Sequence, residues 1–244
     1  MTRTYYVKIT ERIEEDELRG LISRVSETRR VEVLKKRRME DRIQGIVSEL
    51  LIKYVLQKTF GINLYELQIF RGKYGKPFAN VPIQFNISHS KNIILASFSD
   101  SSEIGIDIEE IKPISIRTLK SIFLQEEYEY VQNQEGKEQR LNMFYKFWTL
   151  KESYIKYLGT GLYRDMNTFG FTLNNGITLK DLLNPFYKDK IQFMTGKIEN
   201  YYYSLCCKKE ENIQKFEYID VIRQIKRCRF HQIKTGLSEH LTMG

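Results

Sequence analysis

Ile104-Gly105-Ile106-Asp107-Ile108-Glu109 is the stretch of this 244-residue chain that predicts most about its fold. Its residues alternate as in a β-strand, so the three isoleucines share one face and Gly105, Asp107 and Glu109 share the other. The two carboxylates therefore point the same way and repel each other. A strand tolerates such a pair on a wet surface, or where a cation lies between the two groups. A third carboxylate from another element would favour the cation.

A second stretch, Phe147-Trp148-Thr149-Leu150-Lys151-Glu152-Ser153, lies in a predicted amphipathic helix. Glu152 falls at the edge of the apolar stripe that contains Trp148. A carboxylate so close to a core must be paired, hydrogen-bonded or metal-bound to stay ionised. The same residue also fits an ordinary surface pair with Lys156, four residues further on, worth about 0.2–0.5 kcal/mol.

The spacing leaves open whether Glu152 meets Asp107 and Glu109 in three dimensions. If it does, three hard oxygen ligands with no nearby thiol or histidine suit Mg²⁺, which keeps several waters and binds substrate phosphates.

Helical and strand patterns alternate along the rest of the chain. Residues 14–38 are predicted to be helical with Ser26 as an N-cap, and a second helix runs from Asp41 to a terminator at Gly61. Short strands follow at Leu67–Phe70, Gln84–Ser88, Ile93–Ser99 and Ile104–Glu109, with a loop at Gly72–Pro77. The order then repeats, with helices over about 115–132 and 138–158 and strands near 168–173, 190–195 and 199–207.

Helices followed by strands, twice over, predict an α+β protein of two similar α+β halves that meet near residue 105. We expect an N-terminal half over 1–104, a C-terminal half over 105–230 that carries the acidic residues, and a flexible tail over 231–244.

Composition indicates an ordinary globular protein, with 41% hydrophobic and 29% charged residues. No apolar run approaches the roughly 20 residues of a membrane span, and the N-terminus lacks the apolar stretch of a signal peptide. The three cysteines, Cys206, Cys207 and Cys228, form no metal-binding pair and are expected to be reduced and structural. We expect a cytoplasmic protein without membrane contact.

The net charge of +8 comes from local basic clusters, including Arg29, Arg30 and the residues up to Arg42. Such clusters suit polyanionic partners such as nucleic acid, phosphorylated cofactors or acidic proteins. They fit solvated helix faces equally well.

Two further motifs contain chemically useful side chains. Phe85-Asn86-Ile87-Ser88-His89-Ser90 pairs a hydroxyl with an imidazole, but neighbours on a strand face opposite sides and no nucleophile elbow is present. The hydroxyls and imidazole suit phosphate binding at a strand end, or a structural histidine. Tyr74-Gly75-Lys76-Pro77 is a turn that presents a lysine but is too short for a P-loop.

Taken in order, these four segments resemble the Sfp-type 4′-phosphopantetheinyl transferases over roughly residues 25–205. The resemblance implies two similar α+β halves in a pseudo-twofold arrangement, with the active site between them. It also implies an enzyme that transfers the phosphopantetheine arm of coenzyme A to a serine of an apo carrier protein and releases 3′,5′-ADP. Mg²⁺ is the implied cofactor, coenzyme A the co-substrate, and peptidyl or acyl carrier domains of antibiotic and nonribosomal peptide biosynthesis the partners.

The resemblance also implies roles for individual residues. Asp107, Glu109 and Glu152 match the metal ligands, and Glu152 also matches a position implicated in removing the serine proton. Lys156 matches a catalytic lysine that contacts the phosphates. The positions that match coenzyme A contacts are Lys76, Pro77, Ser88 and His89, with Arg29 and Arg30 near the nucleotide phosphate.

Some positions depart from the family pattern or are weakly defined by it. Gln44 stands where relatives often carry arginine, and Glu32 stands where a lysine contacts phosphate, with Lys35, Lys36 or Arg42 as compensating cations. Glu127 matches an acidic position that supports structure. The carrier-binding surface is expected after the Glu152 helix, around Leu162 and Tyr163, and near Leu124.

We therefore expect a monomeric, Mg²⁺-dependent transferase that does not bind nucleic acid. Two alternatives stay open from the residues: a basic nucleic-acid-binding module, and a non-catalytic protein that binds coenzyme A or a carrier. The first leaves the three carboxylates unexplained, and the second would bind coenzyme A without releasing 3′,5′-ADP.

Overall fold

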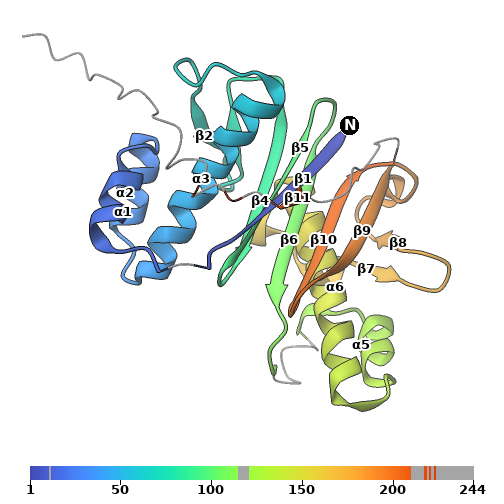
Figure 1. Cartoon of the computed structure of the whole chain (residues 1–244). Coiled ribbons are helices and arrows are strands. Elements are labelled where there is room, and N and C mark those ends of the chain that lie inside the picture. Colours follow the sequence, from blue (N-terminus) through green and yellow to red (C-terminus); the bar gives the residue numbers. More distant parts are fainter. Residues whose placement is uncertain (11, 115–120, 210–216, 219, 221–222, 224–244) are drawn as a thin grey trace, which may run out of the picture.

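The computed structural model describes residues 1–10, 12–114, 121–209, 217–218, 220 and 223 (Figure 1). The expected tail over 231–244 and Cys228 lie outside the described residues, as do the first six residues of the helix expected from 115.

The N-terminal half is built around one four-stranded sheet. Its strands run in the order β11-β1-β5-β4, where β11 (Glu217–Tyr218) follows the C-terminal half in the chain, and a separate hairpin pairs β2 with β3. Helices α1 to α3 lie beside this sheet (Figure 1) and bury a common hydrophobic core against it. The elements are β1 (Thr2–Lys8), α1 (Glu15–Ile22), α2 (Glu27–Leu34), α3 (Met39–Phe60), β2 (Ile69–Arg71), β3 (Pro77–Ala79), β4 (Gln84–Ser90) and β5 (Ile93–Ser99).

The C-terminal half has a three-stranded sheet in the order β6-β10-β9 and a hairpin of β7 with β8. Its core lies between α5, α6, the hairpin and the sheet. The elements are β6 (Ile104–Glu110), α5 (Gln125–Gln132), α6 (Gly136–Leu158), the short 3₁₀ helices η1 (Gly161–Tyr163), η2 (Met166–Thr168) and η3 (Pro185–Asp189), β7 (Phe169–Thr172), β8 (Thr178–Asp181), β9 (Ile191–Ile198) and β10 (Tyr201–Lys208).

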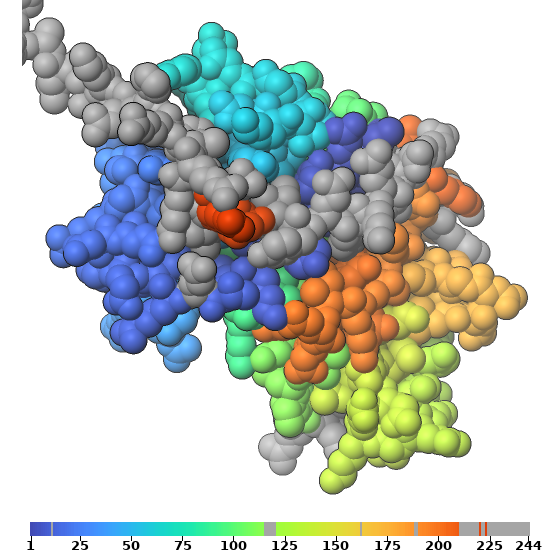
Figure 2. Space-filling view, viewed as in Figure 1, coloured from blue at the N-terminus to red at the C-terminus, as the bar shows by residue number. Residues whose placement is uncertain are grey.

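The predicted α+β class with two halves is confirmed. Each half contains one long helix, α3 with 22 residues and α6 with 23, and both end at a glycine with φ of 67°, Gly61 and Gly159. A left-handed glycine ends a helix without the steric cost that another residue would pay. In space-filling view, blue and cyan atoms of the first half lie at the left and top, and yellow and orange atoms of the second lie at the lower right (Figure 2).

Several predicted boundaries need correction. The helical region expected over 14–38 is two helices that are separated by a turn after Ile22. The predicted N-cap at Ser26 is confirmed, because its side chain starts α2 by accepting a hydrogen bond from Arg29 N. Strands β3 and β8 were not expected from the sequence. β11 pairs in parallel with β1, so a segment beyond residue 210 belongs to the sheet of the N-terminal half. The proposed division at 104/105 stays a prediction.

The two halves are joined by side chains of β4 along the edge of β6. Asn86, Ser88 and Ser90 each accept a hydrogen bond from the backbone amide 20 residues further along the chain, at 2.9, 3.4 and 3.0 Å. A shared hydrophobic cluster packs behind this edge. It contains Ile93, Leu95, Ile106, Ile108, Tyr201 and Leu205. The isoleucine face of β6 is therefore the contact between the halves.

The opposite face of β6 lies directly against α6. A Cβ atom on Gly105 would lie 2.0 Å from Ser153 O and 2.3 Å from Tyr157 N, so only glycine permits this approach. Thr149 and Ser153, the helix residues on this side, are small and fully buried. The close approach puts the next helical turn, with Glu152 and Lys156, beside the acidic positions of β6.

Candidate functional site

The structure brings the three predicted carboxylates together. Asp107 and Glu109 lie on β6, and Glu152 lies on α6 close enough that both strand carboxylates raise its pKa. Burial first, and then Asp107, raise the pKa of Glu109. The repulsion that the strand alone predicted is therefore present between all three groups.

Glu152 has a strongly raised pKa. Burial first, then Asp107 and Glu109, raise its pKa to about 7, and the nearby ammonium group of Lys156 opposes them. A carboxyl with such a pKa is close to half ionised at neutral pH, which is the condition for exchanging a proton efficiently.

Lys156 lies at the centre of the polar contacts. Its Nζ donates to Asp107 Oδ1 at 2.7 Å and to Ser88 Oγ at 2.8 Å. Lys156 therefore forms its ion pair with Asp107. Its charge still acts on Glu152, but the simple surface pair of Glu152 with Lys156 does not describe this site.

Ser88 uses its full hydrogen-bonding capacity within the protein. Its hydroxyl donates to Asp107 Oδ1 at 2.9 Å and accepts from Ile108 N and from Lys156 Nζ. A hydroxyl has one proton and two lone pairs, so nothing is left over for a ligand. In this structure Ser88 orients Asp107, and a direct contact with coenzyme A requires it to give up one of these partners.

The residues present fit a divalent cation in their chemistry. Carboxylate oxygens are the ligands Mg²⁺ prefers, and Asp107 Oδ2 is buried with no hydrogen-bond partner in the described part of the chain. Within the described residues, however, no group of three His, Cys, Asp or Glu side chains is arranged to hold a metal ion. The positive charge beside Asp107 is supplied by Lys156.

His89 lies next to Ser88 but faces the other side of β4. The surrounding protein removes part of its hydration and, with Lys156 and Arg29, lowers the pKa of His89, while Asp41 acts in the opposite direction. The His89 side chain is exposed, and Lys156 and Arg29 act on it through their charges.

Lys76 and Pro77 line a pocket of about 370 Å³ between the halves. Tyr74 contributes from the loop before β3, Glu103 from the position directly before β6, and Tyr157 from α6. Lys76 Nζ already donates to Glu103 Oε2 at 2.6 Å and to Ile104 O at 3.1 Å. A phosphate would therefore compete with Glu103 for this lysine.

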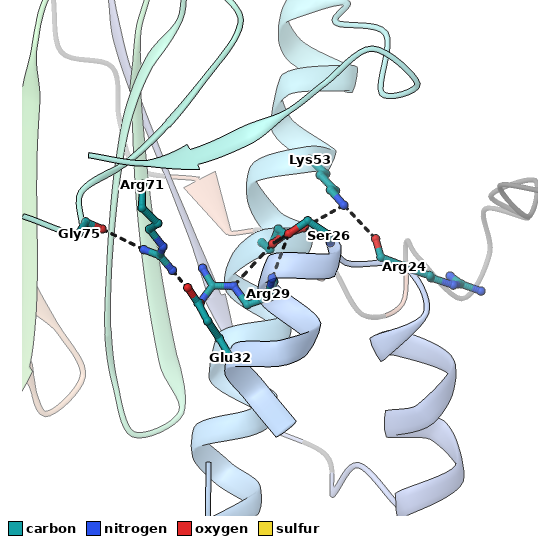
Figure 3. A network of polar contacts seen from close by, with 8 residues as sticks. Arg24, Ser26, Arg29, Glu32, Lys53, Arg71 and Gly75 are labelled. Atoms are coloured by element: carbon teal, nitrogen blue, oxygen red, sulfur yellow. Dashed lines mark hydrogen bonds and ion pairs between the residues drawn. The ribbon is translucent and has the colours of Figure 1, made fainter. Parts of the chain in front are cut away.

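Arg29 belongs to a network of charged residues on the N-terminal half (Figure 3). Its guanidinium donates to Glu32 Oε2 at 2.8 Å, and Arg71 from β2 donates to the same oxygen at 3.0 Å. Burial, followed by repulsion from Arg71, lowers the pKa of Arg29, while Glu32 and the buried Glu49 oppose the shift. Arg30, the neighbouring residue, is exposed on α2.

The two departures from the family pattern have different consequences. Glu32 accepts hydrogen bonds from both Arg29 and Arg71, so two cations lie beside the position where the family pattern expects a lysine. Gln44 is buried and donates to Lys91 O in the β4–β5 turn, where Lys91 has a φ of 47°. Gln44 therefore stabilises a turn. Arg42, one of the cations expected to compensate for the missing arginine and lysine, donates to the backbone oxygen of Lys36.

Comparison with known proteins identifies the family. The family model described as 4′-phosphopantetheinyl transferase superfamily matches residues 103–206, and the one described as 4′-phosphopantetheinyl transferase, N-terminal, matches residues 12–100. The 4′-phosphopantetheinyl transferase gsp of Aneurinibacillus migulanus is 30% identical over 207 residues, covering 85% of this chain and 86% of that protein. The chain belongs to the Sfp-type 4′-phosphopantetheinyl transferase family. The transferase Sfp of Bacillus subtilis (strain 168) is 29% identical over 191 residues, covering 76% of this chain and 84% of that protein.

The protein is therefore an enzyme that transfers phosphopantetheine from coenzyme A to carrier proteins, as the resemblance implied. Among the described residues of the transferase, no helix is long and apolar enough to cross a membrane.

Sequence reasoning missed two residues that contact the predicted site residues or their neighbours. Arg71 gave no signal because its partner Glu32 lies 39 residues away in the chain. Trp148 was assigned to the apolar stripe, yet a hydrogen bond from its side chain to Glu109 opposes the burial and the Asp107 charge that raise the pKa of that carboxyl. An indole N–H in a partly exposed stripe beside a predicted acidic site was the available signal.

The positions of the transferase that were expected to bind the carrier differ in their exposure. Tyr163 is 84% exposed and its ring lies 5.0 Å from that of Tyr74, across the two halves. Leu124 is half-buried over Gly170, and the side chain of Leu162 lies outside the described ones.

Glu127 has the structural role expected of it. It is buried in an ion pair with Lys151 at 2.8 Å and accepts hydrogen bonds from Leu124 N and Phe171 N. Lys151 also donates to Met166 O and so connects α6 to the segment before β7. The pair stabilises the region that follows the Glu152 helix.

Proposed function

We propose that the transferase requires Mg²⁺, that Asp107, Glu109 and Glu152 are its protein ligands, and that Glu152 accepts the proton of the attacking serine. The observation that carries this proposal is the meeting of three carboxylates beside Lys156, with one buried oxygen of Asp107 unpartnered within the described structure. When bound, Mg²⁺ would neutralise charge on the coenzyme A pyrophosphate as it reacts.

The reaction is a substitution at phosphorus. The carrier serine Oγ forms a bond to the β-phosphorus of coenzyme A, and the bond from that phosphorus to the bridging oxygen breaks. The electron pair leaves with 3′,5′-ADP, and the serine proton passes to Glu152, directly or through water. A positioned base of this kind contributes about 10²–10⁴-fold to the rate.

Lys156 is proposed to supply positive charge at the phosphates. In the free protein its ammonium group is bonded to Asp107 and Ser88. A pyrophosphate carries more negative charge than a single carboxylate, so the ligand competes well for this lysine. Its charge then offsets the charge that develops on the leaving oxygen.

The pocket between the halves supports a coenzyme A site there, with Lys76 and Pro77 as contacts. His89 does not line this pocket, and its proposed contact with coenzyme A rests on the family resemblance alone. Ser88 enters this proposal through Asp107, because its hydroxyl is already saturated. Arg30 enters it only as an exposed cation.

The partner and setting are also proposals. We propose that the substrates are peptidyl or acyl carrier domains of antibiotic and nonribosomal peptide assembly, and that the enzyme works as a cytoplasmic monomer. Intact-mass analysis of candidate apo carriers identifies the substrate, and light scattering after size exclusion gives the oligomeric state.

The central test is Glu152→Gln, followed by intact-mass analysis of an apo carrier with coenzyme A and Mg²⁺. We expect the folded variant to lose transfer by at least about 10²-fold, because both a proton acceptor and a metal ligand are removed. Glu126→Gln, which changes an exposed carboxylate paired with Lys180, is the matched control and should retain activity. Near wild-type turnover of the Glu152 variant would falsify both of its proposed roles.

We further propose that Arg71 acts with Arg29 on the phosphate monoester at the nucleotide end of coenzyme A. Two guanidinium groups converge on one partly exposed carboxylate, Glu32, which holds them ready for an anion. Arg71 then supplies a cation that the family pattern expects from a lysine at position 32.

Arg71→Ala should raise the KM for coenzyme A by about 10–100-fold, the equivalent of one charge-assisted hydrogen bond. The KM for 3′-dephospho-coenzyme A, which lacks the monoester, should be unchanged. Arg12→Ala, at an exposed arginine paired with Glu14, serves as the control. Equal effects on the two substrates would show that Arg71 does not read this phosphate.

A further inference from the structure

The backbone amides along the edge of β6 that faces β4 donate to side-chain oxygens of β4 and not to its backbone carbonyls. Asn86, Ser88 and Ser90 lie on the same side of β4, since they are spaced by two residues. Each accepts one amide hydrogen of β6, with a constant separation of 20 residues. These contacts align the N-terminal half with the strand that carries the acidic residues.

Two of these three side chains also contact carboxylates. A hydroxyl that accepts from a backbone amide keeps its own proton to donate. Ser88 donates to Asp107 Oδ1 at 2.9 Å, and Ser90 donates to Glu109 Oε2 at 3.2 Å. Asn86, at the other end of the row, accepts its amide without contacting the acidic cluster.

We propose that Ser90 is a positioning residue that holds Glu109 in place for metal binding. Glu109 is repelled by Asp107 and Glu152, so an unrestrained side chain would rotate toward water. The Ser90 hydroxyl opposes that rotation from the N-terminal half, and Trp148 supports the same carboxylate from α6. The contacts that dock the two halves thus also orient the acidic site.

This inference rests on the proposed metal role of Glu109, and its test is chosen to separate the two. Ser90 and Asn86 both accept one β6 amide, so replacing either removes one docking contact. Of these two residues, only Ser90 also contacts a carboxylate. Asn86→Ala is therefore a matched control for the purely structural contribution.

The experiment measures Mn²⁺ binding by electron paramagnetic resonance, with coenzyme A present and the carrier absent, so that no turnover occurs. Ser90→Ala should weaken Mn²⁺ binding by about 10-fold, the lower end of the effect of losing such a supporting group, because Trp148 remains. Ser90→Thr keeps the hydroxyl and should bind Mn²⁺ nearly as the wild type. Ser90→Val, which matches threonine in shape, should behave like Ser90→Ala.

Asn86→Ala should lower Tm and leave Mn²⁺ binding unchanged. The proposal is overturned if Ser90→Ala and Ser90→Val bind Mn²⁺ as the wild type does, or if Asn86→Ala weakens binding equally. If only this inference fails, Glu152→Gln still abolishes transfer. If the wild type with coenzyme A binds no Mn²⁺ while it transfers phosphopantetheine, the metal ligands are wrong as well.

Discussion

Individual side chains of this site already form hydrogen bonds within the protein when no substrate is bound. Ser88 bonds to Asp107, Lys156 and a backbone amide, and Lys76 bonds to Glu103. Both were expected to contact coenzyme A. A charged ligand must therefore replace existing bonds, which favours groups with high charge, such as a pyrophosphate, over neutral ones.

The lowered pKa of His89 predicts a specific pH dependence of the free energy of unfolding. Its folded pKa lies below the ordinary value of about 6.5, so the unfolded chain binds more protons between the two values. Stability must therefore rise with pH through that window. Urea unfolding from about pH 5 to about pH 7.5 should show that the wild type gains more stability than His89→Gln.

The comparison with the variant matters, because Glu152, with its pKa raised to about 7, titrates in the same window. Subtracting the two curves removes that contribution. Parallel curves for the two proteins would contradict the lowered pKa of His89, which Lys156 and Arg29 help to produce.

At the scale of elements, the contact of α6 with β6 decides whether the site exists. The helix lies so close to the strand that its backbone atoms occupy the space of a side chain at residue 105. Glu152 and Lys156 on α6 reach Asp107 on β6 only because of this approach. On the far side, α6 is fixed to α5 and β7 by the buried Lys151–Glu127 pair.

Gly105→Ala should therefore push α6 away from β6. Overpacking of this kind typically costs about 1–3 kcal/mol, and contact with backbone atoms instead of flexible side chains puts the cost at the upper end or beyond. Transfer activity should fall with stability, because the displaced helix carries Glu152. Urea unfolding and the carrier mass assay measure the two effects.

Gly20→Ala provides the control for adding a methyl group. A Cβ at Gly20 meets nothing within 4 Å, and the residue lies in α1, where alanine is favoured over glycine by roughly 1 kcal/mol. That variant should be at least as stable as the wild type and fully active. A Gly105→Ala protein with the same behaviour would show that the helix does not depend on this contact.

At the scale of the whole molecule, the two halves share buried residues and strands. The cluster of Ile93 and Leu95 with Ile106, Ile108 and Leu205 belongs to neither half alone. The chain also returns after the C-terminal half to pair β11 with β1. Two halves joined by a common core are expected to unfold together.

Trp148, the only tryptophan, reports on the C-terminal half, and far-ultraviolet circular dichroism reports on both. Thermal unfolding followed by the two signals should give one coincident transition. Leu95→Ala, in the N-terminal half, should cost about 2–5 kcal/mol and lower both midpoints equally. Separate transitions, or a shift in only one signal, would show that the halves are independent.

Local patterns were sufficient for the elements whose period is clear. Ile93–Ser99 was predicted with the bounds of β5, and Gly61 was predicted as the end of α3. The break between α1 and α2 was indicated only by the predicted N-cap at Ser26, because both sides of the turn share helical spacing. The short strands β3 and β8 were missed because three or four residues are too few to show a period.

Residue types and spacing by themselves determined the faces of β6, the helix carrying Glu152, and the alternatives open to each carboxylate. Only the tertiary structure decided that Glu152 meets Asp107, that Ser88 orients a carboxylate, and that Arg71 joins Arg29 at Glu32. The reason is physical: alternation and helical period act over a few residues, whereas these contacts join atoms tens of residues apart. Their geometry follows from how closely α6 approaches Gly105 and how β4 aligns with β6.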